Sequence, residues 1–367
     1  MSDQETELKL LRDQIDSIDQ QIHTLLNDRA RCAQSVAEVK ERYQQGDREA
    51  VFYRPEREAQ VLRRVMQRNQ GPLADHEVAR LFREIMSVCL ALEKPMHVAF
   101  LGPEGTFTQQ AASKHFGHSA HCIPFNSNDE VFREVESGGA HYGVVPIENS
   151  SEGVVTHTLD LFKRFNLKIC GEVELRIHHH VLRVGDEGLD NIARIYLPQQ
   201  TLSQCRSWLD THFLSAERIL VSSNAEAARM AVKQGPAAVA IASDLVADLY
   251  QLNIVARNID DQSDNSTRYL IIGDQDVGES GHDKTSILVT VPDKAGALYE
   301  LLQHFHQHKI SLTGIETRPA SPESSHSVFY IDFEGHAANQ HIQGVLQELQ
   351  SDTVELKLLG SYPVAVL

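Results

Sequence analysis

Two cations, Arg29 and Lys40, lie eleven residues apart in a segment whose apolar residues recur every three or four positions. That period indicates a helix of roughly 35 to 40 residues, on which a separation of eleven residues leaves two side chains about 20° apart. Arg29 occupies one step of the apolar pattern, where a guanidinium needs an anion. The two cations could bind that anion together, or Arg29 could be a register-setting residue paired with an acid. Arg12 points in a different direction from Arg29 and Lys40, and it could contribute to a site in a neighbouring subunit.

The helix that carries these cations is on the order of 55 Å long, which is more than a single globular domain can cover. We therefore expect it to pair with another chain. We expect the long helix to end near Gly46. Glycine and proline then separate a second helix, from about Pro55 to Asn69, and a third that ends before Pro95. Glu93 borders the apolar stripe of the third helix. The stripe of the long helix contains Leu8, Leu11, Ile15, Ile18, Ile22, Leu25, Cys32, Val36 and Val39.

Composition describes a protein of two to three domains, with 367 residues and 41% hydrophobic content. The N-terminus has no apolar signal region, so we expect a cytoplasmic protein without membrane spans. The five cysteines are scattered and lack CxxC spacing, which favours free thiols. A net charge of −17 argues against nucleic acid and anionic membranes as partners. The first 94 residues are nearly balanced in charge, so an anion can bind there.

From His97 onwards, strands and helices alternate. The strand HVAFL leads into GPEGTFTQQAA, where the amides of a helix start, with Thr106 and Thr108 beside them, could hold a carboxylate or phosphate. A simple strand-to-helix turn is the alternative, because no nucleotide-binding glycine pattern is present. Glu148 and Asn149 end another strand, which is a usual place for site residues in an open α/β sheet.

The stretch from Gly171 to Val184 is predicted to be one strand, in which His178 and His180 share a face. We expect no metal there, because no third ligand has suitable spacing. The chain returns with the strand NSTRYLIIG, and Asp274–Lys284 is a natural linker. The last segments read strand, helix, strand, strand, helix, strand, which is the order of a ferredoxin-like fold.

Together these motifs resemble the bifunctional chorismate mutase/prephenate dehydratases of bacterial phenylalanine biosynthesis. LRDQID, DRARCAQSVAEVK and RPEREAQVL resemble the mutase; GPEGTFTQQAA, VPIENSSEGV and NSTRYLII resemble the dehydratase; PDKAGALYELL and GIETRPAS resemble its phenylalanine-sensing ACT domain. The resemblance covers essentially the whole chain. It implies an all-α mutase domain at 1–95, a dehydratase domain of two α/β lobes at 96–274, a linker at 275–284 and an α+β ferredoxin-like ACT domain at 285–367.

The family's two reactions require no cofactor or metal. The mutase rearranges chorismate to prephenate pericyclically, so it must fold its substrate into a chair and stabilise charge on the breaking ether. The dehydratase removes water and carbon dioxide from prephenate to give phenylpyruvate. The resemblance also implies feedback inhibition by phenylalanine and a homodimer, or a higher homo-oligomer, whose mutase sites take residues from both chains.

The resemblance carries specific roles to residues of the mutase. Arg29 and the Arg12 of a partner chain would bind the carboxylates of chorismate, and Lys40 would donate to its ether oxygen. Glu58 would hold the hydroxyl group, with Arg57 beside it.

Three residues depart from the family's mutase pattern. Cys89 and Glu93 stand where some relatives have serine and glutamine, and Arg54 stands where an aspartate is common. Glu93 can donate to the ether oxygen only when it is protonated; burial favours that form and Lys40 opposes it. We therefore predict that mutase turnover falls as the pH rises, and that Glu93→Gln flattens this dependence.

In the dehydratase, Thr267 is by resemblance the essential hydroxyl and Arg268 an anion partner, with Asn149 and Gln204 as further contacts. A threonine hydroxyl is too weak an acid to protonate a leaving group unaided, so we expect hydrogen bonding or a proton relay. Tyr269 replaces the phenylalanine that usually follows the Thr-Arg pair. Leu197-Pro198 replaces a Ser-His pair of some relatives. The family pattern places the lobes at 97–174 plus 255–275, and at 175–254.

The ACT domain would bind phenylalanine near two motifs. These are Gly296-Ala297-Leu298, in GALY where the family has GALV, and Glu316-Thr317-Arg318-Pro319, in place of ESRP.

The sequence leaves two alternative functions open. One is a working dehydratase with a weak or silent mutase, and the other is a non-catalytic amino-acid sensor.

Overall fold

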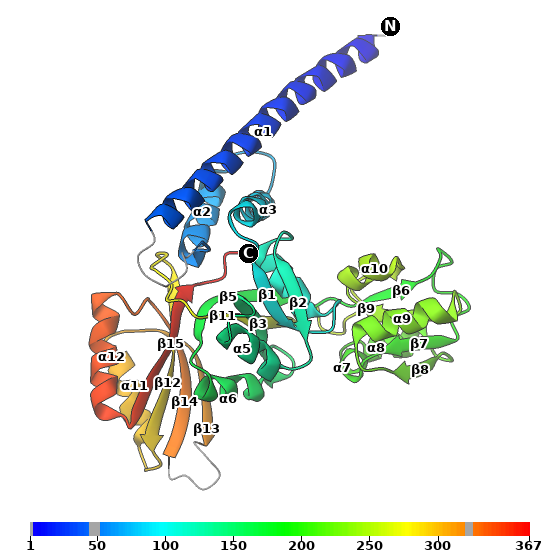
Figure 1. The fold of residues 1–367 in the computed structure, drawn as a ribbon. Coiled ribbons are helices and arrows are strands. Elements are labelled where there is room, and N and C mark those ends of the chain that lie inside the picture. The colour runs from blue at the N-terminus through cyan, green and yellow to red at the C-terminus, as the bar shows by residue number, and fades with distance from the viewer. Residues whose placement is uncertain (1–2, 44–51, 320–325) are drawn as a thin grey trace.

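The computed structural model describes residues 3–43, 52–319 and 326–367, which form three parts in chain order (Figure 1). Gly46, near which the first helix was expected to end, and Ala320-Ser321 of the GIETRPAS motif lie outside these residues. Among the described helices, none is long and apolar enough to cross a bilayer.

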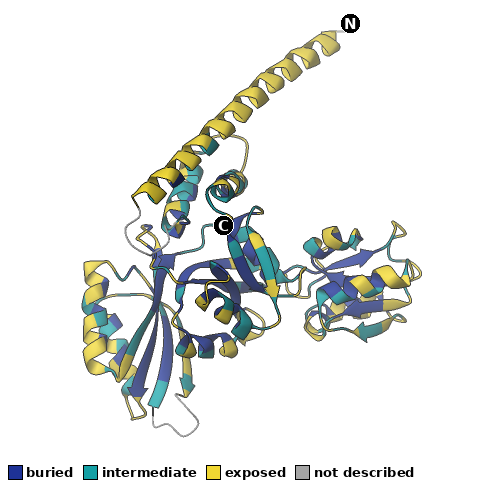
Figure 2. Cartoon of the chain, viewed as in Figure 1, coloured by how far each residue is buried: buried dark blue, intermediate teal, exposed yellow. Residues whose placement is uncertain are grey.

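The first part is helical and contains α1 (Asp3–Arg42), α2 (Pro55–Arg68) and α3 (Asp75–Glu93). Pro55 occupies the first turn of α2, where its missing N–H is tolerated. The C-terminal end of α1 packs against α3, which also packs against α2, while the rest of α1 extends away from the molecule (Figures 1 and 2). The apolar stripe is therefore uncovered within one chain, and Ile15 is 56% exposed.

A mixed sheet forms the first lobe of the middle part. Its strands are β1 (His97–Leu101), β2 (His121–Phe125), β3 (Tyr142–Asn149), β4 (Gly153–Val154), β5 (Lys168–Arg176) and β11 (Ser266–Gly273), in the order β2-β1-β3-β11-β5 with β4 beside β3. Its helices are α4 (Phe107–Phe116), α5 (Asn128–Glu136) and α6 (Thr156–Arg164). Strand β11 runs antiparallel to both neighbours, so the start of β11 lies beside the end of β3.

The second lobe has the strand order β10-β6-β9-β7-β8. Its elements are β6 (His180–Arg183), β7 (Arg194–Leu197), α7 (Gln199–Gln204), α8 (Arg206–His212), β8 (Glu217–Leu220), α9 (Asn224–Gln234), β9 (Ala238–Ala242), α10 (Asp244–Tyr250) and β10 (Asn253–Ala256). The single strand expected between Gly171 and Val184 is therefore wrong: the chain passes from one lobe to the other at 177–179. It returns at 257–265, and the two passages are joined by the hydrogen bond from Ile259 N to His179 O.

The third part is one antiparallel sheet with two helices on one face. It contains β12 (Asp283–Pro292), α11 (Ala297–Gln307), β13 (Leu312–Pro319), β14 (His326–Glu334), α12 (Gln340–Asp352) and β15 (Glu355–Pro363), with the strand order β13-β14-β12-β15. The other face of the sheet packs on the first lobe, where Leu288, Tyr330 and Tyr362 share a buried cluster with Leu161 and Phe162. The two parts thus share one hydrophobic core.

Candidate active sites

The packing of α1 against α3 brings Lys40 to Glu93. Lys40 Nζ lies 3.7 Å from Glu93 Oε2, which is an ion pair but too long for a hydrogen bond. Lys40 Nζ also donates to the carbonyl oxygen of Phe52 at 3.1 Å. Among the described residues, nothing donates a hydrogen bond to the buried Glu93 Oε2. This carboxyl group is therefore placed to exchange a hydrogen bond with a bound molecule.

The charge state of Glu93 depends on three opposing influences. Burial raises the pKa of Glu93 above its ordinary value, and the positive charges of Lys40 and then Arg29 counteract that increase. The direction predicted for burial and for Lys40 is confirmed. The half-buried Arg29 is thus a second positive charge that acts on the same carboxyl group.

The other residues assigned to the mutase do not join this cluster within one chain. Arg12, Arg54 and Arg57 are exposed, and Cys89 is buried in α3. Arg12 and Lys40 are 28 residues apart on α1, which corresponds to about 42 Å along the axis. One copy of α1 therefore cannot bring both side chains to one small molecule.

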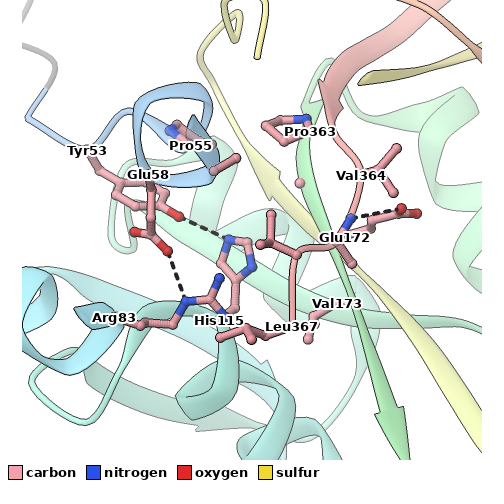
Figure 3. A pocket seen from close by; sticks show the side chains of 14 residues that line it. Tyr53, Pro55, Glu58, Arg83, His115, Glu172, Val173, Pro363, Val364 and Leu367 are labelled. Atoms are coloured by element: carbon pink, nitrogen blue, oxygen red, sulfur yellow. Dashed lines mark hydrogen bonds and ion pairs between the residues drawn. The ribbon is translucent and has the colours of Figure 1, made fainter. Parts of the chain in front are cut away.

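Glu58 faces a different set of residues. Arg83 Nε donates to Glu58 Oε1 at 3.1 Å, and the Tyr53 hydroxyl is 3.1 Å from His115 Nε2. Figure 3 shows these four side chains in a pocket that the C-terminal residues 363–367 also line. The structure therefore places Glu58 at the junction of all three parts of the chain, bound to Arg83, and does not bring it together with Lys40 and Glu93.

Burial governs the charges in this junction. It raises the pKa of Glu58, which the neighbouring Arg83 opposes, and it lowers the pKa of His115 to about 3. His115 is thus neutral at physiological pH, and Arg83 is the positive partner of the Glu58 carboxylate. Arg83 and His115 gave no sequence signal because each lies within an ordinary amphipathic helix.

Asn149 and Thr267 form the centre of the second candidate site. They are paired across β3 and β11, and Asn149 Nδ2 donates to Thr267 Oγ1 at 2.8 Å. Asn149 Oδ1 accepts hydrogen bonds from the backbone amides of Ser151 and Glu152, at 2.9 and 3.0 Å. These bonds fix the orientation of the Asn149 amide, so its nitrogen is the atom that faces Thr267.

Arg268 lies on the opposite face of the same strand, because successive side chains of a strand alternate. It donates to Glu172 at 2.8 Å, to Asp332 at 2.6 Å and to the Tyr362 hydroxyl at 3.0 Å. The prediction that Arg268 partners a substrate anion beside Thr267 is therefore corrected. Its partners are two carboxylates and a phenol hydroxyl of this chain, and they join the first lobe to β14 and β15.

Glu148 shares the face of Arg268, since the two residues are paired across β3 and β11. It is exposed and lines a cavity between the first lobe and the C-terminal sheet, together with Asp332 and Glu316. Glu148 is therefore turned away from Asn149.

Two side-chain hydrogen bonds join the two lobes. Gln200 Nε2 donates to Glu152 Oε2 at 2.8 Å, and Gln110 Nε2 donates to Asp244 Oδ1 at 2.8 Å. Gln204 lies at the end of α7, half-buried, with its carbonyl oxygen bonded to the amide of Asp261. Leu197 is buried at the end of β7, and Pro198 precedes α7.

The helix start at α4 is partly satisfied by its own residues. Gly105 N donates to Gln109 Oε1 at 2.6 Å, and Gln109 N donates to Thr106 Oγ1 at 3.4 Å. The turn interpretation therefore accounts for these two amides. Thr108, in the first turn of α4, is instead buried.

His179, Cys205 and Asp260 are described residues whose ligand atoms all lie within 4.8 Å of one another. His179 Nδ1 and its backbone amide already bond to Asp260, at 2.5 and 2.9 Å. Burial raises the pKa of the Cys205 thiol, which opposes the thiolate form that a metal needs. We interpret this cluster as a structural contact that holds together the two segments that connect the lobes, 177–179 and 257–265. His180 Nδ1 accepts from Asn258 N, and His178 lies beside Asp260.

The two motifs assigned to phenylalanine lie at the same end of the C-terminal sheet. Gly296, with φ of 90°, precedes α11, and Leu298 is 40% exposed. Thr290 and Arg318 are both paired with Val328, so β14 separates the two motifs. Arg318 also donates to Asp160 of α6 at 3.1 Å. Ala297 is half-buried, and the exposed residues of the second motif are Glu316, Thr317 and Pro319.

Comparison with known proteins identifies the first two parts of the chain. Residues 11–94 match the family model described as chorismate mutase type II, and residues 98–277 match prephenate dehydratase. A bifunctional chorismate mutase/prephenate dehydratase of Pseudomonas aeruginosa is 55% identical over 367 residues, covering 100% of both chains.

Two solved structures are similar to the part that follows the helices. A prephenate dehydratase of Arthrobacter aurescens in complex with L-Phe is 33% identical, has a TM-score of 0.67, and covers 73% of this chain and 90% of that chain. A protein described as the quorum quenching acylase GqqA is 26% identical, also with a TM-score of 0.67, and covers 74% of this chain and 98% of that chain.

Proposed function

The chain belongs to the family of bifunctional chorismate mutase/prephenate dehydratases, and from this premise we propose how one polypeptide carries out both reactions. It rearranges chorismate to prephenate and converts prephenate to phenylpyruvate. The observation that carries the assignment to residues is the hydrogen bond between Asn149 and Thr267 at the end of two paired strands.

For the mutase, we propose a site that is shared by two copies of the chain. Arg29 and Lys40 of one copy supply positive charge, and Arg12 of the second copy supplies the remaining guanidinium. The uncovered apolar stripe of α1 supports this arrangement, because a second α1 would bury it. Glu58 would reach this site only if its bond to Arg83 were exchanged for one to the substrate.

Glu93 would act in its protonated form. A neutral carboxyl group donates a hydrogen bond to the ether oxygen as charge develops on it, whereas a carboxylate would repel that charge. Burial of Glu93 and the absence of a bound donor at its Oε2 among the described residues support this role. The raised pKa extends the protonated form to higher pH than an exposed glutamate allows.

For the dehydratase, Thr267 would hydrogen-bond the departing hydroxyl group of prephenate. Asn149 holds the Thr267 oxygen in place, and both side chains are buried, so solvent competes little for the hydrogen bond. The site is built within one chain, from the ends of β3 and β11 and the inter-lobe contacts around them. Gln204 remains a further substrate contact in this proposal.

We propose that the C-terminal part is an ACT domain with a ferredoxin-like fold, and that it inhibits the enzyme when phenylalanine binds. Its element order and the L-Phe complex of the Arthrobacter aurescens relative support this assignment. Inhibition needs a physical connection between the sites. Two ion pairs provide it: Arg318 with Asp160, and Arg268 with Asp332.

A paired assay on the full-length protein tests this function. Chorismate consumption and phenylpyruvate formation would each be measured with and without phenylalanine. We expect phenylpyruvate from chorismate, with less of it when phenylalanine is present. If phenylpyruvate forms when prephenate is supplied but not when chorismate is supplied, the mutase is silent. If neither substrate gives a product, the result favours a non-catalytic sensor.

A further inference from the structure

Asn265 is the last residue of the segment 257–265, along which the chain returns from the second lobe to the first. Its backbone carbonyl oxygen accepts a hydrogen bond from Ile177 N at 2.9 Å, and its side chain is buried. Asn149 Nδ2 donates to Asn265 Oδ1 at 3.1 Å, and the same nitrogen donates to Thr267 Oγ1 at 2.8 Å. Asn265 is therefore a third polar residue at the candidate dehydratase site.

Backbone hydrogen bonds determine which end of the Asn265 amide faces Asn149. Asn149 Oδ1 accepts from the backbone amides of Ser151 and Glu152, so the Asn149 nitrogen is the atom that faces Asn265. A donor nitrogen needs an acceptor opposite, and Asn265 presents its oxygen. The hydroxyl groups of Ser150 and Ser151 donate to the same oxygen, each at 3.3 Å. The Asn265 nitrogen therefore lies on the other side of the amide group, away from these donors.

The two amides differ in what they can offer to a bound molecule. Both lone pairs of Asn149 Oδ1 are occupied by backbone amides. The two hydrogens of its nitrogen are shared by three acceptors, which are Thr267 Oγ1, Asn265 Oδ1 and, at 3.3 Å, the carbonyl oxygen of Ser266. By contrast, no described residue accepts a hydrogen bond from Asn265 Nδ2, and this nitrogen is not fully enclosed. Asn265 thus has two hydrogens available, whereas Asn149 has none.

The chemistry of this free donor suits a carboxylate. An amide nitrogen can only donate, and the strongest acceptors on prephenate are its carboxylates. Arg268 was expected to bind the substrate anion, but its guanidinium group bonds to Glu172 and Asp332. Asn265 supplies a donor for that anion close to Thr267.

We propose that Asn265 is a substrate-binding residue of the dehydratase, whose amide nitrogen donates to a carboxylate of prephenate. Asn149 then acts as a positioning residue, because it holds the oxygen atoms of both Asn265 and Thr267. The direction of the Asn265 nitrogen is fixed before the substrate binds, so little side-chain entropy is lost on binding. This inference rests on the proposed role of Thr267 in the dehydratase.

The test is Asn265→Asp in the full-length protein, which keeps an oxygen for Asn149 to contact and replaces only the nitrogen. At about pH 8 the new carboxyl group is ionised and meets the substrate carboxylate, so we expect KM for prephenate to rise on the order of a hundredfold. The dehydratase kcat should change by less than about threefold, because Thr267 keeps its bond to Asn149. Mutase activity in the same sample should be unchanged.

The pH dependence of KM separates a donor role from a structural one. A protonated carboxyl group has an O–H that can donate where the amide nitrogen donated. Lowering the pH from about 8 to about 5 should therefore reduce the ratio of the variant's KM to that of the original protein by about tenfold. Ser151→Ala is the matched control, because it removes a contact to the Asn265 oxygen and leaves the nitrogen unchanged. Its KM should change by less than about twofold.

Three results would overturn the proposal: an unchanged KM in Asn265→Asp at about pH 8, a KM ratio that does not vary with pH, or an equal rise of KM in Ser151→Ala. If circular dichroism shows that Asn265→Asp does not fold, Asn265→Ser takes its place. Serine keeps an acceptor oxygen and removes the amide nitrogen, so KM should rise about tenfold, and an unchanged KM would exclude the role.

The outcome is also distinct from failure of the proposed function. If Thr267→Ala retains full dehydratase activity, Thr267 is not a site residue and the wider assignment fails. If Thr267→Ala is inactive and Asn265→Asp has the KM of the original protein, only the role of Asn265 is excluded.

Discussion

The dehydratase half and the mutase half of this molecule position their candidate residues in opposite ways. Asn149 and Thr267 are buried and bonded to each other within one chain. In the mutase half, Arg12 is exposed on a helix whose apolar stripe has no cover within that chain. The difference teaches that a sheet completes a site through its own strand pairing, whereas a single long helix needs a second copy to do so.

The largest expected effects test whether the two sites are independent. Thr267→Ala should lower dehydratase activity by on the order of a thousandfold and leave mutase activity unchanged, because the hydroxyl and methyl groups that it removes lie at the Asn149 contact, within the dehydratase site. Arg29→Ala should do the reverse, since it removes a cation next to Lys40 and Glu93. Both activities would be measured for each variant.

Conservative variants serve as controls for this pair. Thr267→Ser and Arg29→Lys should each retain part of the affected activity. Loss of both activities from either alanine variant would indicate unfolding and contradict the separation of the sites.

The next effect concerns the uncovered helix. Changing both Ile15 and Ile22 to aspartate would place charges where a second helix should pack, so we expect mutase activity to fall by on the order of a hundredfold. Dehydratase activity should persist, because its site lies within one chain. Gln20→Asp is the matched control on the opposite side of α1. Mutase activity that survives in a variant shown by light scattering to have lost its α1 pairing would contradict the shared site.

The pH dependence of the mutase gives a smaller effect. The pKa of Glu93 is raised, so its protonated form is lost as the pH rises through that value. Above it, mutase turnover should decline by up to about tenfold per pH unit. Glu93→Gln should flatten this profile, because an amide donates at every pH. A variant that keeps the original slope would show that another group titrates.

The smallest effect tests the link between the dehydratase and the C-terminal sheet. Asp332→Asn removes the negative partner of Arg268 and retains the shape of the side chain. We expect the phenylalanine concentration for half-inhibition to rise about threefold, with little change in uninhibited turnover. Asp186→Asn, at an exposed position of the second lobe, is the matched control. Equal shifts in the two variants would contradict a pathway through Arg268.

Several features could be predicted from residue patterns alone. The period of three and four residues predicted one continuous helix, and the structure contains α1 over 40 residues. The proximity of Glu93 to an apolar stripe predicted the direction of its pKa shift. These predictions succeed because they depend on neighbours within a few turns of the same element, where spacing determines which side chains meet.

Other features depended on contacts between distant segments. Arg268 follows Thr267 in sequence, yet strand alternation turns it towards Glu172 and Asp332, and only the docked C-terminal sheet shows what it binds. Glu58 was assigned to chorismate by resemblance, and the fold instead packs it against Arg83 at the junction of three parts.

Sequence alone was sufficient to establish the order of the parts, the long amphipathic helix and the identities of residues that could do the chemistry. Tertiary structure decided which of those residues meet: it joined Asn149 to Thr267 and bound Arg268 to Glu172 and Asp332. The reason is physical, because strand pairing and core packing act between residues that are here 64 to 118 positions apart. Local spacing contains no information about such contacts.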